Sequence, residues 1–156
     1  MRPVRVYADT SVFGGVFDEE FAMPSRVFFQ QVREGRFHLL LSALVRYELD
    51  DAPVQVRRFF DEIADTSDVH ETPEKAVLLR DSYLRAGIVG PSSVADALHV
   101  AHATVLKCRL IVSWNFKHIV HFEKIPRYNK VNGREGYAEI AVHTPQEVIG
   151  YEQEGL

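Results

Sequence analysis

The sequence has 156 residues, of which 46% are hydrophobic and 26% charged, and its formal net charge is −4. This composition is typical of one globular domain, expected here to span residues 1–156, with enough apolar residues for a core. The single cysteine, Cys108, excludes an internal disulfide framework. No apolar run approaches the ~20 residues of a membrane span, and the N-terminus lacks the pattern of a signal peptide. We therefore expect a cytoplasmic protein without a membrane segment.

The hydrophobic pattern predicts strands that alternate with helices along the chain. In chain order we expect strand 4–8, a short imperfect helix over 10–17, a helix over 24–34, strand 37–41, helix 43–50, a helix that starts at 53, strand 68–71, helix 73–85, helix 94–106, strand 109–113, a loop or short helix over 115–122, an irregular polar segment over 123–138, strand 139–143, and a terminal helix that starts with the capping-box-like sequence 144–147.

This alternation implies a parallel sheet whose strands are joined by right-handed crossovers. The apolar run Phe37–Leu41 fits a strand that is covered on both faces. The predicted fold class is therefore α/β: a three-layer α/β/α sandwich with a mostly parallel central sheet and a Rossmann-like topology.

Three acidic residues lie beside predicted strand ends or helix starts. Asp9 follows the first strand, Glu48 lies in the helix after the second strand, and Asp96 lies at the start of the helix over 94–106. Ligands of open α/β sheets bind outside the carboxyl ends of the strands. Carboxylates about 5 Å apart repel each other by roughly 3 kcal/mol at an effective dielectric constant near 20. A divalent cation would explain why they gather there.

Each acid also has an ordinary structural explanation. Asp9 precedes Thr10-Ser11, and all three residue types are preferred helix N-caps. Glu48 fits a surface glutamate paired with an arginine. Asp96 stands three residues after Ser93, as in a capping box, and an acid in a first helical turn is also favoured by the helix dipole.

The positive charges are concentrated in residues 107–134. This segment has seven Lys or Arg residues and one acid, so it carries +6 and leaves −10 for the rest of the chain. Such asymmetry fits a surface that follows nucleic-acid phosphates beside an acidic metal site. A solvated loop with charges placed by chance is the alternative.

The four motifs together resemble those of PIN-domain proteins. The matching segments are Val6-Tyr7-Ala8-Asp9-Thr10-Ser11, Ser42 through Glu48-Leu49, Val94-Ala95-Asp96-Ala97-Leu98-His99-Val100-Ala101, and Leu110-Ile111-Val112-Ser113-Trp114-Asn115-Phe116. They follow the family's order and spacing over residues 4–116. Each motif alone is loose, whereas the ordered set is moderately specific.

The resemblance implies a metal-dependent ribonuclease. Asp9, Glu48 and Asp96 would then hold Mg²⁺ or Mn²⁺ for the hydrolysis of RNA phosphodiesters. Asn115 occupies a place where many family members have a fourth acid, which puts a second metal ion in doubt. The expected supporting and substrate-binding residues are Ser11, Ser113, Lys117 and His118. By the same resemblance the chain is similar to the VapC-like toxins of bacterial toxin–antitoxin pairs, which implies an antitoxin partner and a homodimer.

Other interpretations stay open at this stage. Because Asn115 replaces an acid, a PIN-fold module that binds RNA or protein with little catalysis is the main alternative. A phosphatase with Asp9 as nucleophile would need a second Asp two residues later, where this chain has Ser11. The pairs His99/His102 and His118/His121 have a spacing that allows zinc binding, although structural roles fit them better. Trp114, Tyr128 and Tyr137 are candidates to stack on unpaired bases or to pack in the core.

Overall fold

The computed structural model describes residues 3–150, and the predicted domain 1–156 also includes residues 1–2 and 151–156, which lie outside this range. The strands are β1 (Val4–Ala8), β2 (Phe37–Ser42), β3 (Asp68–His70), β4 (Leu110–Val112) and β5 (Ala141–His143). The helices are α1 (Thr10–Gly15), α2 (Ala22–Arg33), α3 (Ala43–Glu48), α4 (Val54–Ala64), α5 (Glu74–Arg85), the 3₁₀ turn η1 (Pro91–Ser93), α6 (Val94–Val105), α7 (Ile125–Arg134) and α8 (Pro145–Ile149). The predicted strands are all confirmed, with boundaries within two residues.

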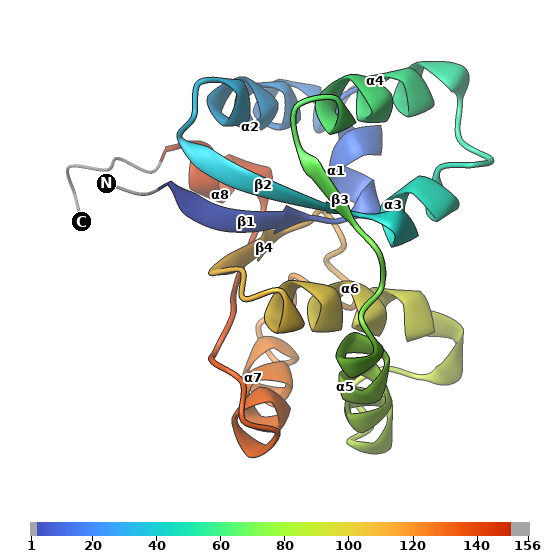
Figure 1. The fold of residues 1–156 in the computed structure, drawn as a ribbon, viewed down its shortest axis with the longest axis vertical. Coiled ribbons are helices and arrows are strands. Elements are labelled where there is room, and N and C mark those ends of the chain that lie inside the picture. The colour runs from blue at the N-terminus through green and yellow to red at the C-terminus, as the bar shows by residue number, and fades with distance from the viewer. Residues whose placement is uncertain (1–2, 151–156) are drawn as a thin grey trace.

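The strands form one parallel sheet in the order β3-β2-β1-β4-β5. Helices α1, α2 and α4 lie on one side of it, and α5, α6 and α7 lie on the other (Figure 1). The predicted three-layer α/β/α sandwich is therefore confirmed. After β1 the chain builds the β2-β3 side and then returns to add β4 on the other side of β1. The order of the strands thus reverses between β1 and β4, so the topological switch point lies at the carboxyl ends of these two strands.

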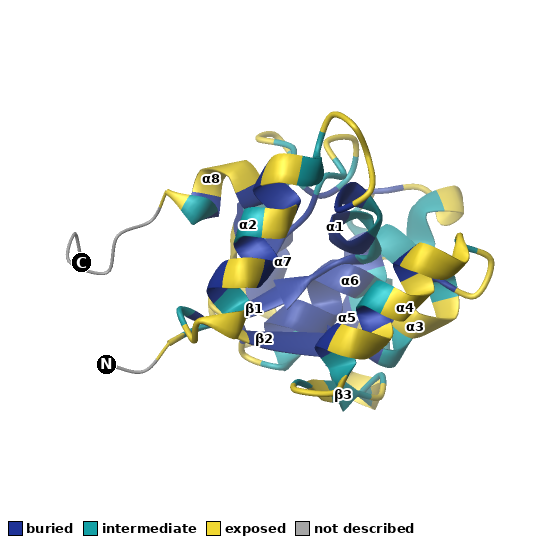
Figure 2. Ribbon diagram, turned by 90° about the horizontal axis from the view of Figure 1, so that it is seen from above, coloured by how far each residue is buried: buried dark blue, intermediate teal, exposed yellow. Residues whose placement is uncertain are grey.

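Successive strand residues point to opposite faces of the sheet and pack into two separate cores, so the sheet is buried on both faces (Figure 2). Val6, Ala8, Leu39 and Leu41 pack with the aromatic residues of α1, α2 and α4. Tyr7, Leu40, Ile111 and Val142 pack against α5, α6 and α7. No helix within residues 3–150 is both long and apolar enough to cross a membrane.

The irregular segment predicted over 123–138 is wrong, because residues 125–134 form α7. Pro126 is tolerated in the first helical turn, where no backbone N–H is needed. The two asparagines serve tertiary contacts: Asn129 Nδ2 donates to the carbonyl of Ile140 at 3.0 Å, and Asn132 Oδ1 accepts from Tyr83 Oη at 2.5 Å. Burial of Tyr128 and of this polar network outweighs the poor helix propensity of the segment.

Gly15 is required where α1 passes α2 and the loop after β4. A Cβ at this position would lie 2.7 Å from Ser25 Oγ and 2.8 Å from Trp114 Nε1. We expect Gly15→Ala to destabilise the protein by about 1–3 kcal/mol, because the added methyl group overpacks a buried contact. Urea unfolding followed by the fluorescence of Trp114, the chain's only tryptophan, measures the change.

Gly14→Ala is the matched control for this prediction. The neighbouring position has open space, with no atom within 4 Å of an added Cβ. Because alanine is the better helix former, this variant is expected to gain about 0.5–1 kcal/mol. Equal stability of the two variants would contradict the packing argument.

Candidate active site

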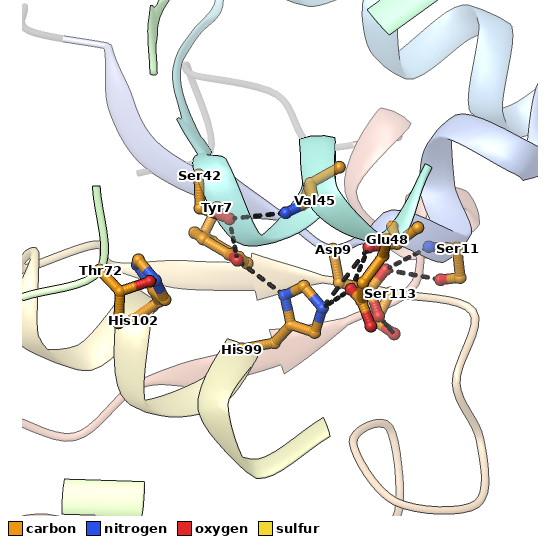
Figure 3. A network of polar contacts seen from close by, with 11 residues as sticks. Tyr7, Asp9, Ser11, Ser42, Val45, Glu48, Thr72, His99, His102 and Ser113 are labelled. Atoms are coloured by element: carbon orange, nitrogen blue, oxygen red, sulfur yellow. Dashed lines mark hydrogen bonds and ion pairs between the residues drawn. The ribbon is translucent and has the colours of Figure 1, made fainter. Parts of the chain in front are cut away.

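Asp9 lies at the carboxyl end of β1 and is only 3% exposed (Figure 3). Its carboxylate accepts the backbone N–H of Ser11 at 3.1 Å, so it does cap α1. It also accepts two hydroxyl hydrogen bonds at 2.6 Å, from Ser11 Oγ to Oδ1 and from Ser113 Oγ to Oδ2. Because Ser113 follows β4, the bond between Asp9 and Ser113 spans the topological switch point.

Glu48, the last residue of α3, reaches the same cluster. Its Oε1 accepts a hydrogen bond from Thr10 Oγ1 at 2.5 Å and lies 2.5 Å from His99 Nε2. Thr10 directly follows Asp9, which brings the two carboxylates to one edge of the sheet. The alternative of a surface glutamate paired with an arginine is wrong, because the partners of Glu48 are a threonine and a histidine.

A buried chain of hydrogen bonds runs from Ser42 through Tyr7 and His99 to Glu48 (Figure 3). His99 Nδ1 lies 2.7 Å from Tyr7 Oη, which in turn lies 2.8 Å from Ser42 Oγ. An imidazole with its proton on Nε2 donates to Glu48 and accepts the phenolic proton of Tyr7 on Nδ1. In this tautomer the Ser42 hydroxyl donates to Tyr7, Tyr7 donates to His99, and His99 donates to the Glu48 carboxylate, which only accepts. The chain of bonds fixes the direction in which His99 points at Glu48.

The two carboxylates have opposite pKa shifts. Burial raises the pKa of Asp9, and this effect outweighs the opposing electrostatic influence of His99 and the hydrogen bonds from Ser11 and Ser113. Burial also acts to raise the pKa of Glu48, but the contacts with His99 and Thr10 lower it below its usual value. The surroundings therefore disfavour the charged form of Asp9, whereas they favour the charged form of Glu48.

Asp96 lies in the first turn of α6, one turn before His99. The capping-box alternative is wrong, because Ser93 makes no capping hydrogen bond and its Oγ lies 3.0 Å from His118 Nε2 instead. The side chain of Asp96 makes no hydrogen bond or ion pair with any other residue of the described chain. Its charge acts on His118 and Tyr128. Asp96 therefore lies near the loop after β4, and the described residues do not bring it into one cluster with Asp9 and Glu48.

Within residues 3–150, no three His, Cys, Asp or Glu side chains lie close enough together to form a preformed metal site. The residues that do converge are Asp9 and Glu48, with the hydroxyls of Thr10, Ser11 and Ser113 around them. Carboxylate and hydroxyl oxygens are the hard ligands that Mg²⁺ accepts. The chemistry of this cluster thus fits a hard divalent cation.

Comparisons with solved structures support this view of the fold. One match is VapBC2 from Rickettsia felis bound to a DNA fragment from their promoter, with a TM-score of 0.59, 14% identity, and coverage of 90% of this chain and 98% of the other. The others are FitAcB from Neisseria gonorrhoeae (TM-score 0.57, 13% identity, 90% and 97% coverage) and VapBC-1 from nontypeable Haemophilus influenzae (TM-score 0.59, 14% identity, 91% and 98% coverage).

The chain has a PIN-type fold. This confirms the fold expected from the sequence resemblance, and at 13–14% identity the likeness concerns the fold. No protein-family model and no curated protein matches the sequence.

The loop after β4 borders the carboxylate cluster of the PIN-type fold. Asn115 Oδ1 accepts the backbone N–H of His118 at 3.0 Å, so this side chain is used to shape the loop. Lys124 Nζ lies 3.0 Å from His118 Nδ1, and burial together with this cation lowers the pKa of His118. Lys117 is exposed on the same loop. A histidine and two lysines therefore stand beside the site.

Several residues singled out in the sequence have packing roles. Trp114 stacks on Phe21 with ring centroids 4.2 Å apart, and its Nε1 donates to Ser25 Oγ at 2.9 Å. Tyr128 is fully buried. The histidine pairs form no metal cluster in the part of the chain that the structure describes.

The sequence did not reveal that Tyr7 and His99 support the site through hydrogen bonds. The sequence places Tyr7 in a strand and its motif, and it favours a structural or surface role for His99, with zinc binding as the alternative; neither interpretation predicts a contact with Glu48 or a role in supporting the site. One signal was available: His99 follows Asp96 by one helical turn, so both lie on the same face of α6. Tyr7, two residues before Asp9 in β1, gave no comparable signal.

Proposed function

We propose that this chain is a metal-dependent endoribonuclease in which Asp9 and Glu48 hold Mg²⁺ or Mn²⁺ and Asp96 adds a ligand from α6. The observation that carries the proposal is the buried Asp9 carboxylate beside Glu48 at the switch point of a PIN-type fold. A divalent cation offsets both the burial of this anion and its repulsion from the second one. When bound, the ion would lower the pKa of a water ligand and stabilise charge on the phosphate.

The chain's own residues would orient the two carboxylates and the RNA. Ser11 and Ser113 fix Asp9, whereas Thr10 and His99 fix Glu48. Lys117 and His118 lie on the loop after β4, and in this proposal they would contact the substrate phosphate.

An exposed aromatic side chain supports a single-stranded substrate. Phe116 follows Asn115 on the loop beside the site and is 51% exposed. Unpaired bases stack on such aromatic side chains. We therefore favour single-stranded RNA, or an unpaired loop of a structured RNA, as the substrate.

We further propose that the chain is the toxin of a toxin–antitoxin pair, active as a homodimer in the cytoplasm. Two observations support this proposal: the fold shared with chains of the VapBC and FitAcB structures, and the large exposed apolar residues Met23, Tyr47 and Phe122, at 74%, 75% and 82% exposure. Such side chains are the kind that partner surfaces bury. A short upstream reading frame that encodes a DNA-binding protein would support the antitoxin.

The test is cleavage of a labelled single-stranded RNA, with DNA of the same sequence in parallel, as Mn²⁺ is titrated. We expect cleavage of RNA that a chelator abolishes. Glu48→Gln keeps an acceptor for Thr10 and His99 but removes the charge, so it should raise the Mn²⁺ concentration for half-maximal cleavage by roughly 10–100-fold. Glu34→Gln, exposed at the end of α2 on the opposite edge of the sheet, is the control. Cleavage that resists the chelator would refute the proposal.

A catalytically weak binding module is the second candidate, and Asn115 favours it. Its amide occupies the place of a fourth acid, and its Oδ1 is already used by the backbone of His118. RNA binding without cleavage at any Mn²⁺ concentration would support this module.

A further inference from the structure

Four basic residues line a groove between α5 and α7. It has a volume of about 670 Å³. We call it the cationic groove and define it by its four basic residues, Arg85 from α5 and Arg127, Lys130 and Arg134 from α7. All four are exposed, and Glu135 is the one acid among the residues that line the groove. The groove thus carries a net charge of +3 in a chain whose total is −4.

Neighbouring groups orient these cations without neutralising them. Arg85 Nη2 donates to Ser82 Oγ at 3.0 Å, and Arg127 Nη2 donates to the carbonyl of Ala86 at 2.8 Å. Glu135 Oε1 accepts a hydrogen bond from Ser82 Oγ at 2.8 Å. None of the four cations forms an ion pair with a described residue. Their charges are therefore available to an external anion.

The spacing along α7 indicates a polymeric anion rather than a single phosphate. Arg127, Lys130 and Arg134 are three and four residues apart, so they share one face over about 10 Å of helix. Like charges at this spacing repel each other, so their position on one face of the helix does not by itself stabilise the fold. A nucleic-acid strand presents a negative charge at every nucleotide and can contact all three cations at once.

The groove is linked to the candidate active site through the start of α7. Tyr128 Oη donates to the carbonyl of His118 at 2.7 Å, and Lys124, directly before α7, contacts the ring of the same histidine. Helix α7 then runs away from the sheet beside α5 (Figure 1). We propose that the cationic groove binds the phosphate backbone of the RNA beyond the cleaved bond. This inference rests on the proposed function, because RNA is the polyanion that the site would cleave.

The charge-reversal variant Lys130→Glu/Arg134→Glu tests the proposal. Binding of a fluorescein-labelled oligouridylate is measured by anisotropy in EDTA, at KCl concentrations from about 50 to about 200 mM. Each lost phosphate contact lowers the slope of log affinity against log salt by about 0.7 for a single strand, so we expect a decrease of about 1.4 and roughly tenfold weaker binding. Arg57→Glu/Arg58→Glu on α4, across the sheet, is the matched control and should leave both values unchanged.

The outcomes separate this inference from the proposed function. Groove-dependent binding without cleavage supports the groove and refutes the ribonuclease. If the protein cleaves RNA but Lys130→Glu/Arg134→Glu leaves the slope of log affinity against log salt unchanged, the groove is refuted. A change of oligomeric state in light scattering, with RNA affinity intact, also refutes it, because the groove would then face a second protein chain. If the reversal lowers the melting temperature, Lys130→Gln/Arg134→Gln replaces it, and an unchanged slope in that folded variant refutes the groove.

Discussion

Asp9→Asn is expected to abolish cleavage while the protein stays folded. Asparagine is as good an N-cap as aspartate, so α1 keeps its cap, and its amide still offers an acceptor to Ser11. The substitution removes the buried anion that would hold the metal ion. Charge stabilisation by a metal ion is worth several kcal/mol, and each 1.36 kcal/mol is tenfold in rate, so cleavage should fall by roughly a hundredfold or more. Single-turnover cleavage at saturating Mn²⁺ measures the loss.

The same variant should be more stable than the wild type at neutral pH in EDTA. Because burial raises the pKa of Asp9, the folded state binds more protons than the unfolded state between the two pKa values. Wild-type stability therefore falls as pH rises through this window, whereas Asp9→Asn lacks this loss. Urea unfolding at several pH values should show a stability gap that closes as the pH falls below the ordinary range of an aspartate.

The exposed Asp61→Asn on α4 controls for the loss of one carboxylate. Two results would count against the argument: near wild-type cleavage by Asp9→Asn, or a variant less stable than the wild type at neutral pH. Gain of stability together with loss of cleavage would identify Asp9 as a residue kept for function at a cost in stability.

The parts of the fold that sequence reasoning predicted correctly are those in which local pattern and burial agree. Phe37–Leu41 is apolar except for the exposed His38, because β2 is covered on both faces over most of its length. Thr144 with Glu147 forms the predicted capping box of α8. Helix α7 was not predicted because its asparagines and glycine have low helix propensity. The asparagine contacts that stabilise it reach Tyr83 and Ile140, which no local pattern reveals.

Of the three acids that the sequence singles out, the structure brings Asp9 and Glu48 together but not Asp96, and the residues that support them were not predicted. Parallel strands end at one edge, so the positions of Asp9 and Ser113 follow from topology. The contacts of His99 with Tyr7 and Glu48 join residues 92 and 51 positions apart in the sequence and depend on how α6 packs.

The basic segment 107–134 is divided by the fold rather than kept as one surface. Lys107 and Arg109 lie with Arg5 at the amino-terminal edge of the sheet, far in topology from the residues on α7. Arg85, outside the segment, joins the cationic groove instead. Charge counted along the sequence therefore does not show which basic residues share a surface in the fold.

His102 is expected to make the protein sensitive to acid. The residue is 0% exposed on α6, its ring stacks on Tyr7, and Nε2 lies 3.0 Å from Thr72 Oγ1. Its Nδ1 has no hydrogen-bond partner in the described chain. Burial, with the nearby His99 and His70, lowers the pKa of His102 from 6.5 to about 4.

The sign of the effect follows from the lowered pKa. The unfolded chain binds a proton at His102 below pH 6.5, whereas the folded chain resists it down to about pH 4. Stability is thus fully present above the unfolded pKa and is lost as the pH falls through this window. A shift of this size corresponds to about 3 kcal/mol of unfolding free energy.

His102→Leu removes the titrating ring and adds no polar atom that would need a buried partner. We expect the free energy of unfolding of this variant to fall by about 3 kcal/mol less than that of the wild type between pH 7 and pH 4. His38→Leu, at an exposed position of β2, is the matched control. Because Asp9 is present in all three proteins, its opposite pH dependence cancels in the comparison. If His102→Leu and the wild type lose stability in parallel, the folded protein must accept a proton at His102 readily, which its buried and unpartnered Nδ1 argues against.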